Sequence, residues 1–224
     1  MDAEHYKRLA ARAALELLPD SGVLGLGTGS TTRYFIEAVA ELVHGGRAFS
    51  GVPTSEQSRE LAARLRIPLL ADEGPWDIAL AVDGADEVSP ELDLIKGGGG
   101  AHTREKLVNL AARANVIVID EAKLSPKLGS LRGVPVEVLP FAHRETARRL
   151  ARHGQATLRL AGHEVFRTDS GNYVYDVQTG PIDDPRGLDV ALKTIPGVVE
   201  TGLFCGRADV VLVAGSAGVR RLCR

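Results

Sequence analysis

The sequence predicts an α/β protein in which helices cover both faces of a mostly parallel sheet. Three observations support this. Short apolar segments alternate with amphipathic ones over the first half of the chain. Segment 77–82 (DIALAV) is apolar throughout, as expected of a parallel strand buried on both faces. Beyond residue 130 the expected order becomes strand, helix, strand, strand, helix, strand. We therefore expect a Rossmann-like domain over 1–129 and 206–224, and a smaller inserted α+β, ferredoxin-like (βαββαβ) domain over 130–205.

Hydrophobic periodicity and breakers predict the elements of the larger domain. Thr54-Ser55-Glu56-Gln57 has the form of a capping box and predicts a helix with Thr54 as its N-cap. The expected elements are a helix over 4–18, a strand over 23–27, a helix over 32–44, a strand over 48–53, a helix to about 66, strands over 67–70 and 77–82, a helix over 103–113 and a strand over 115–119.

The second domain is expected from the same signals. Its predicted elements are a strand over 134–139, a helix over 141–153, strands over 156–160 and 172–177, a helix over 184–195 and a strand over 198–204. The apolar segment 209–214 (DVVLVA) is expected to return to the first sheet.

Composition excludes several classes of protein. The formal charge of −2 gives no basic footprint for nucleic acid. Cys205 and Cys223 have no metal-ligand or CxxC spacing and are expected to be reduced thiols. The N-terminal segment lacks the basic and apolar regions of a signal peptide, and no apolar run reaches the roughly 20 residues of a membrane span. We therefore expect a cytoplasmic protein with neither a membrane nor a nucleic-acid partner.

A glycine-rich turn, Gly25 to Thr31 (GLGTGST), lies between an expected strand and an expected helix. Backbone N–H groups and the helix N-terminus favour an anion there, and a phosphate is the natural ligand. The turn lacks the third glycine of a dinucleotide site and the lysine of a P-loop. A tight turn without a ligand remains the alternative.

Two carboxylates follow the apolar strand in the segment DGADE. Asp83 and Asp86 are expected at the carboxyl edge of the sheet, where open α/β sheets bind ligands. They could hold sugar hydroxyls, move protons or bind Mg²⁺, although no further metal-ligand set is evident. Turn and capping chemistry is the alternative for Asp83. Glu87 and Glu91 are expected to be solvated.

A lysine and four consecutive glycines come next, followed by a glutamate in the first turn of a helix. Lys96 can neutralise charge on a carbonyl oxygen, and glycines 97–100 let a substrate approach bare backbone. Glu105 could be a general base, or only a glutamate favoured by the helix dipole. Lys106 is expected to face solvent. Lys123 follows another strand and is either a ligand for an anion or a surface lysine.

Together these sequence motifs resemble those of the type A ribose-5-phosphate isomerase family. Six motifs carry the resemblance, in order, from about Lys7 to Gly218: GLGTGST, AVDGADE, IKGGGGAHTREK, NVIVIDEAK, VPVEVLP and IPGVVETGLF. The family usually has three glycines and then alanine after the lysine, so Gly100 is a substitution. The interval from Lys96 to Glu105 is the same as in the family.

The resemblance implies an aldose–ketose isomerase that interconverts D-ribose 5-phosphate and D-ribulose 5-phosphate through a cis-enediolate, in the non-oxidative pentose phosphate pathway. It implies no cofactor, no essential metal and a homo-oligomer, expected to be a homodimer. The resemblance implies that Asp83 assists ring opening and that Glu105 transfers a proton from C2 to C1. It also implies that Lys96 stabilises the oxyanion and that Asp86 holds the sugar hydroxyls. The residues expected to bind substrate are Thr28, Gly29, Ser30, Thr31, Asp83, Gly84, Ala85, Asp86, Lys96, Gly97, Gly98, Gly99 and Lys123.

Two other functions stay open. A non-catalytic phosphosugar-sensing domain of related fold would keep the glycine-rich turn but would need neither Lys96 nor Glu105. A related amino-sugar-phosphate isomerase or deaminase should carry a general-base histidine, and no histidine here has that context. Solvent deuterium entering C1 of the product would separate an isomerase from a sensor.

Overall fold

The computed structural model describes residues 3–224 and divides the chain into two compact units. The first unit contains the described residues up to Ala85 together with Arg104–Ala122 and Arg207–Arg224. The second unit contains Asp86–Thr103 and Lys123–Gly206. The predicted α/β fold class is confirmed for this chain.

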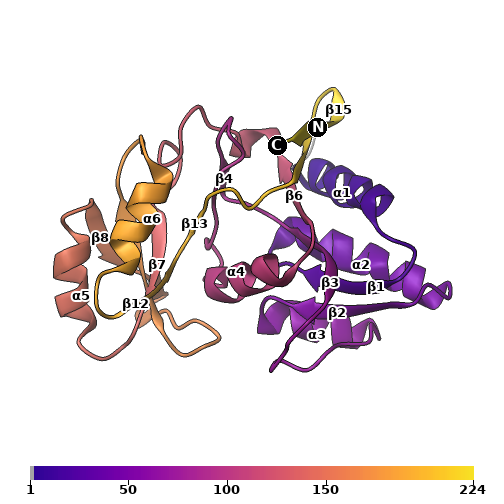
Figure 1. The fold of residues 1–224 in the computed structure, drawn as a ribbon, viewed down its shortest axis with the longest axis horizontal. Coiled ribbons are helices and arrows are strands. Elements are labelled where there is room, and N and C mark those ends of the chain that lie inside the picture. Colours follow the sequence, from indigo (N-terminus) through magenta and orange to yellow (C-terminus); the bar gives the residue numbers. More distant parts are fainter. Residues whose placement is uncertain (1–2) are drawn as a thin grey trace. The chain divides into compact units, whose positions relative to one another are not determined.

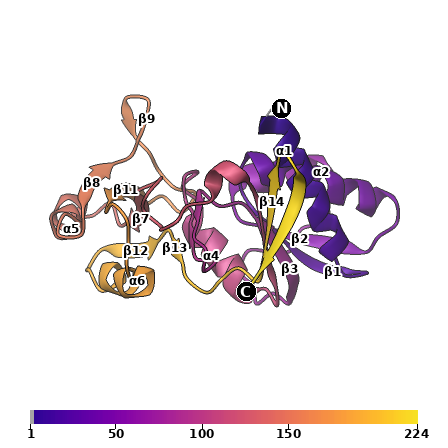
Figure 2. The same ribbon diagram turned by 90° about the horizontal axis from the view of Figure 1, so that it is seen from above.

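The first unit is built on a six-stranded sheet in the order β15-β14-β6-β3-β1-β2. All neighbouring strands are parallel except β15, which forms an antiparallel hairpin with β14. Figure 2 shows this hairpin beside α1. The strands are β1 (Gly22–Leu26), β2 (Phe49–Pro53), β3 (Ile78–Asp83), β6 (Asn115–Asp120), β14 (Val210–Gly215) and β15 (Gly218–Cys223).

Helices pack on both faces of this sheet (Figure 1). The larger core joins Ala10, Phe35 and Ala62 of three helices to Leu24 and other strand residues. On the opposite face, a smaller core packs helix residue Val108 with Val52, Ile78 and Ala81 of the strands. The helices are α1 (Ala3–Ala13), the 3₁₀ turn η1 (Ala14–Leu17), α2 (Ser30–His44), α3 (Glu56–Arg64) and α4 (His102–Ala111).

The second unit contains a four-stranded antiparallel sheet in the order β12-β7-β11-β8. In chain order this is the 4-1-3-2 arrangement of a ferredoxin-like fold, as the sequence predicted. A small hairpin, β9 and β10, extends from it (Figure 2). The elements are β7 (Val134–Val138), α5 (His143–Leu150), β8 (Gln155–Leu158), β9 (Leu160–Ala161), β10 (Glu164–Val165), β11 (Tyr173–Gln178), α6 (Pro185–Lys193) and β12 (Val198–Thr201).

The second unit is larger than the domain predicted over 130–205. A three-stranded sheet explains the difference, because β13 (Leu203–Phe204) pairs with β5 (Leu94–Ile95), which pairs with β4 (Glu87–Val88). Ile95 also packs in the apolar core of the second unit. The segment Asp86–Thr103 therefore belongs to this unit rather than to the predicted 1–129 domain, of which residues 1 and 2 lie outside the described residues.

Several predicted elements differ locally. The strand expected over 67–70 was wrong, because this segment forms only an isolated parallel bridge between Leu69 and Gly51. The N-cap of α3 is Ser55, whose side chain accepts a hydrogen bond from the Ser58 N–H, and the prediction of Thr54 was wrong by one residue. The N–H of Thr54 instead bonds to the carbonyl of Leu26 and extends the pairing of β2 with β1. Helix α5 starts at His143 rather than at Phe141, because Ala142 adopts a left-handed conformation with φ of 53°.

Candidate functional site

The residues predicted to form the site fall on both units, and each group is described within its own unit. The first unit carries Thr28, Gly29, Ser30, Thr31, Asp83, Gly84, Ala85 and Glu105. The second unit carries Asp86, Lys96, Gly97, Gly98, Gly99 and Lys123.

The glycine-rich turn and Asp83 meet at the carboxyl edge of the parallel sheet. The Asp83 carboxylate accepts hydrogen bonds from the backbone N–H of Thr28 (3.1 Å) and of Gly84 (2.7 Å). A side chain on Gly27 would overlap Asp83, so glycine is required for this approach. The turn is thus held against the end of β3 by a carboxylate that is only 8% exposed.

Four hydroxyl groups hold the turn from the other side. The hydroxyl of Thr28 lies 2.7 Å from that of Thr54 and donates to that of Ser55 at 2.8 Å. Thr54 donates to the carbonyl of Leu26, and Ser58 donates to the carbonyl of Gly27. Sequence reasoning missed Thr54, Ser55 and Ser58 as supports of the turn. The hydroxyl residues just after β2 were the available signal in the sequence. Because β1 and β2 are parallel neighbours, residues that follow β2 lie at the same edge of the sheet as the turn that follows β1.

Helix α2 begins at Ser30, within this glycine-rich segment, with Gly29 as its N-cap. Gly29 has φ of 114° and ψ of 179°, a conformation that favours glycine. The first hydrogen bond of the helix runs from the Arg33 N–H to the Gly29 carbonyl, which leaves the earlier N–H groups outside the helical pattern. Gly29 and Ser30 are exposed and Thr31 is half-buried. These backbone donors and the helix dipole suit an anion.

A groove lies beside that helix terminus within the first unit. Its volume is about 520 Å³, and Ser30, Arg33, Gln57 and Arg64 line it together with Glu4. Glu60 lines the groove as well, and Arg33 pairs with Glu4 and Glu37, so the charges of the groove are balanced. An anionic group at the N-terminus of α2 would therefore rely on the backbone donors and hydroxyls of the helix terminus.

Glu105 lies in the first turn of α4 and is 5% exposed. It lines a small cavity together with Asp83, Gly27 and Asn109. The cavity volume is about 10 Å³, room for about one water molecule. The structure thus brings Glu105 and Asp83, which are distant along the chain, to one cavity, and a carboxylate pair so placed can transfer protons.

The neighbours of Glu105 show that the whole first turn is packed. Arg104 donates to the Glu56 carboxylate at 2.7 Å, which ties α4 to the start of α3. Lys106 is only 7% exposed, so the prediction that it faces solvent was wrong. His102 is fully buried.

In the second unit, Lys96 follows β5 and is 3% exposed. Its backbone N–H bonds to the carbonyl of Gly202 at 2.9 Å, and its ammonium group lies 5.5 Å from the centre of the Phe204 ring. Burial of an ammonium group makes it a strong local source of positive potential. Lys123 ends the 3₁₀ turn η2 (Glu121–Lys123) and is half-buried.

The glycine segment 97–100 forms a tight turn in which the Gly100 N–H bonds to the Gly97 carbonyl. Gly97 and Gly100 have φ of 104° and 78°. The Gly98 N–H donates to the Asp86 carboxylate at 2.7 Å, which unites two predicted site residues. Gly98 and Gly99 are exposed, whereas Gly97 is buried, so the tip of the turn presents bare backbone.

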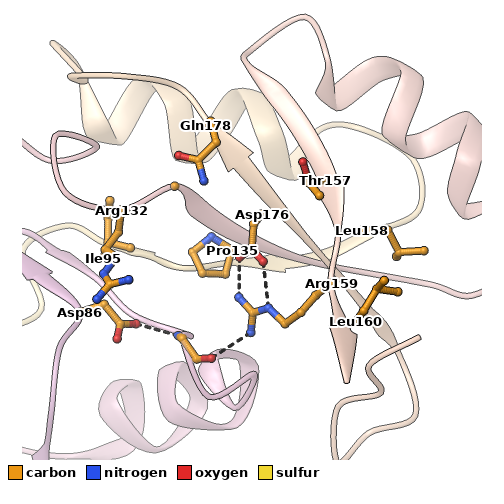
Figure 3. A pocket seen from close by; sticks show the side chains of 12 residues that line it. Asp86, Ile95, Arg132, Pro135, Thr157, Leu158, Arg159, Leu160, Asp176 and Gln178 are labelled. Atoms are coloured by element: carbon orange, nitrogen blue, oxygen red, sulfur yellow. Dashed lines mark hydrogen bonds and ion pairs between the residues drawn. The ribbon is translucent and has the colours of Figure 1, made fainter. Parts of the chain in front are cut away.

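Two charged residues of the second unit were missed by sequence reasoning. Arg159 donates to the carbonyls of Gly97 (2.8 Å) and Gly98 (3.2 Å), and its guanidinium forms a two-pronged ion pair with Asp176. Figure 3 shows this arrangement at one side of a cavity of about 820 Å³ that Asp86 and Gly98 also line. The sequence analysis predicted the two strands that contain these residues, over 156–160 and 172–177, but only the structure shows that the strands pair.

The environment of Glu87 differs from the prediction made from the sequence. It is fully buried, and its carboxylate accepts hydrogen bonds from the backbone N–H groups of Gly129, Ser130, Leu131 and Arg132 at 3.1–3.2 Å. The prediction that Glu87 is solvated was wrong, because its partners lie more than 40 residues further along the chain.

No group of three or more histidine, cysteine, aspartate or glutamate side chains with metal-binding geometry occurs within residues 3–224. Over the same residues, no helix has both the length and the apolar character to cross a membrane.

Glycine-rich donors at a helix N-terminus, a buried carboxylate pair and a buried lysine beside bare backbone define a class of protein. They are typical of an enzyme that moves protons on a phosphorylated sugar.

Comparison with known proteins identifies the family. Residues 50–218 match the family model described as ribose 5-phosphate isomerase A, phosphoriboisomerase A. The ribose-5-phosphate isomerase A of Chloroflexus aurantiacus is 45% identical over 98% of this chain and 93% of its own length. That of Thermococcus kodakarensis is 43% identical over 99% of both chains. The chain belongs to the ribose 5-phosphate isomerase A family and is an isomerase.

Solved structures agree in fold. A D-ribose-5-phosphate isomerase in complex with phospho-erythronic acid superposes with a TM-score of 0.95 at 41% identity, over the full length of both chains. The ribose 5-phosphate isomerase A of Methanocaldococcus jannaschii has a TM-score of 0.93 at 41% identity, again over both full chains.

Proposed function

We propose that this protein interconverts D-ribose 5-phosphate and D-ribulose 5-phosphate as a step of the non-oxidative pentose phosphate pathway. Membership of the family and the full-length similarity to isomerases support the reaction. The phospho-erythronic acid bound by one relative is a four-carbon phosphorylated acid, and it supports a sugar phosphate as the ligand.

The observation that carries the mechanism is the shared cavity of Asp83 and Glu105. In our proposal Asp83 assists ring opening by taking the anomeric hydroxyl proton and returning a proton to the ring oxygen. Glu105 then removes the proton from C2 of the open aldose, which yields a cis-enediolate, and delivers a proton to C1. Transfer of a proton from O2 to O1 completes the balance, so the ketose is formed without an external oxidant or reductant.

Negative charge develops on oxygen in this scheme. We assign its stabilisation to Lys96 and to the backbone N–H groups of Gly97 and Gly99. We assign the holding of sugar hydroxyls to Asp86, whose carboxylate is itself held by the Gly98 N–H. The burial of Lys96 and the exposed tip of the glycine segment support the assignment. Each fixed donor of this kind typically contributes about 10²- to 10³-fold in rate.

The phosphate is assigned to the N-terminus of α2. The proposed donors are Gly29, Ser30 and Thr31, with Thr28 shaping the turn and Lys123 adding charge. Gly84 and Ala85 complete the proposed binding surface next to Asp83. The exposed backbone of Gly29 and Ser30 supports this assignment.

Isotope exchange tests the function directly. Enzyme and ribose 5-phosphate are incubated in heavy water, and the ribulose 5-phosphate is examined by NMR for deuterium at C1. We expect deuterium at C1, because a carboxylate base exchanges its proton with solvent. A phosphosugar sensor would bind the sugar without forming product, and that outcome would overturn the proposal.

We also propose a cytoplasmic homodimer that acts without a cofactor or an essential metal, as the family resemblance implies. Analytical ultracentrifugation of the purified chain would test the dimer, since a monomer at micromolar concentration would exclude it.

A further inference from the structure

Arg159 anchors the backbone of the glycine segment. One of its terminal nitrogens, Nη1, donates to the carbonyls of both Gly97 and Gly98. The remaining edge of the guanidinium, Nε and Nη2, is bound by the two carboxylate oxygens of Asp176 on β11. The side chain of Arg159 is 15% exposed and that of Asp176 is 31% exposed, so the pair is partly shielded from water.

The strand pairing explains why the guanidinium is held in one place. Arg159 directly follows β8, and its N–H bonds to the carbonyl of Val174 on β11. Asp176 lies two residues further along β11, opposite Thr157 of β8. The ring of Phe166 packs 5.7 Å from the guanidinium carbon and occupies the space that a side chain on Gly100 would need. The substitution of glycine at position 100 therefore fits this packing.

These contacts fix two successive peptide groups. The Gly97–Gly98 peptide is held at both ends, with its carbonyl on Arg159 and its N–H on Asp86. The Gly98–Gly99 peptide is held by its carbonyl. Because the N–H of a trans peptide points opposite to its carbonyl, the direction of the Gly99 N–H is set as well. Without such anchors, glycine backbone would sample many conformations.

We propose that Arg159 is a positioning residue for catalysis, which aims the backbone donors of the glycine segment and thereby the adjoining Lys96. This rests on the proposed roles of Lys96 and the glycine segment. Arg159 acts through the backbone, because its guanidinium is engaged by the two glycine carbonyls and by Asp176. Asp176 serves as the second support, because it fixes the orientation of the planar guanidinium.

The test compares Arg159→Ala, Arg159→Lys and Asp176→Asn with Arg167→Ala as the matched control. Arg167 is an exposed arginine of the same unit that bonds to Gly171 and Tyr173. We expect Arg159→Ala to fold and to lose about 10²-fold in kcat with a smaller change in KM, since misplaced groups cost rates of that order. Arg159→Lys should regain only a small part of the kcat lost in Arg159→Ala, because an ammonium group cannot bridge the carboxylate and both carbonyls. Asp176→Asn should be intermediate, and the control should match wild type.

Chemical rescue separates positioning from a general structural role. Guanidinium, added well below denaturing concentrations, should restore kcat to Arg159→Ala but not to Arg159→Lys, where the site is filled. Near wild-type kcat in folded Arg159→Ala, or the absence of rescue, would overturn the proposal.

A double variant distinguishes failure of this inference from failure of the proposed function. If Arg159 acts through Lys96 and the glycines, adding Arg159→Ala to Lys96→Gln should lower kcat far less than it does in wild type. Independent, multiplicative losses would overturn the positioning role alone. Wild-type kcat in Lys96→Gln would instead overturn the proposed role of the lysine.

Discussion

The buried carboxylate of Glu87 yields the sharpest stability prediction. It accepts four backbone hydrogen bonds from consecutive residues 129–132, at distances of 3.1–3.2 Å, and is fully buried. In Glu87→Gln one oxygen becomes an NH₂ group of nearly the same size. That group donates rather than accepts, and it would face backbone N–H groups.

The magnitude follows from this geometry. Oε1 accepts from Ser130 and Leu131, and Oε2 accepts from Gly129 and Arg132. The amide keeps one pair of bonds, weakened by the lost charge, and leaves the other two donors unsatisfied. Each buried unsatisfied donor costs about 1–3 kcal/mol, so we expect the two of them to lower the free energy of unfolding by about 2–6 kcal/mol. For a chain of this size that lowers Tm by about 4–24 °C.

The assay combines thermal unfolding with amide hydrogen exchange. Glu164→Gln, an exposed glutamate of the same unit, is the control for the loss of one charge. In wild type the amides of residues 129–132 should exchange slowly, and in Glu87→Gln they should be the first to lose protection. A Tm within about 2 °C of the control, with protection intact, would refute the assigned role of the carboxylate.

Three further predictions concern the proposed base, the expected independence of a metal and the cap of α3. Glu105→Gln should fold normally but lose about 10²- to 10⁴-fold in kcat because the base is removed, and turnover close to wild type would contradict the assignment. Exhaustive chelation should leave the rate unchanged, and a loss of activity restored by Mg²⁺ would instead make Asp83 and Asp86 candidate metal ligands. Ser55→Ala should destabilise α3 by about 0.5–2 kcal/mol in denaturant titration, because it removes the cap of the helix, and an unchanged midpoint would count against the cap.

The sequence predicted the fold class because its signals are local. Apolar strands such as β3 and β14, and the breakers between elements, act within a few residues of one another. The cap of α3 was misplaced because Thr54 and Ser55 are both good caps. Only the pairing of Thr54 with β1 decides between them. The extent of the second unit depends on β5 pairing with β13, a contact between segments roughly a hundred residues apart.

The parts of the candidate site were predictable to different degrees. Asp83 and Glu105 were predicted as site residues from motifs, and the structure adds that they share a cavity. The contacts that hold the glycine segment and loop 129–132 were not predictable in the same way. Arg159 reaches the glycines across about 60 residues, and Glu87 is surrounded by N–H groups of a loop that no local pattern marks. Such contacts depend on tertiary structure, which periodicity and turn chemistry do not encode.

The hydroxyl network around the glycine-rich turn has a consequence for titration. Thr28, Thr54, Ser55 and Ser58 are uncharged at every physiological pH, and two of these hydroxyls donate to fixed carbonyls. These hydroxyl groups therefore neither gain nor lose protons as pH changes, in contrast to the Asp83 carboxylate that also holds the turn. If a phosphate monoester binds at Gly29 to Thr31, the hydroxyl network adds nothing to the pH dependence of its affinity near pH 6, where the ligand itself undergoes its second ionisation.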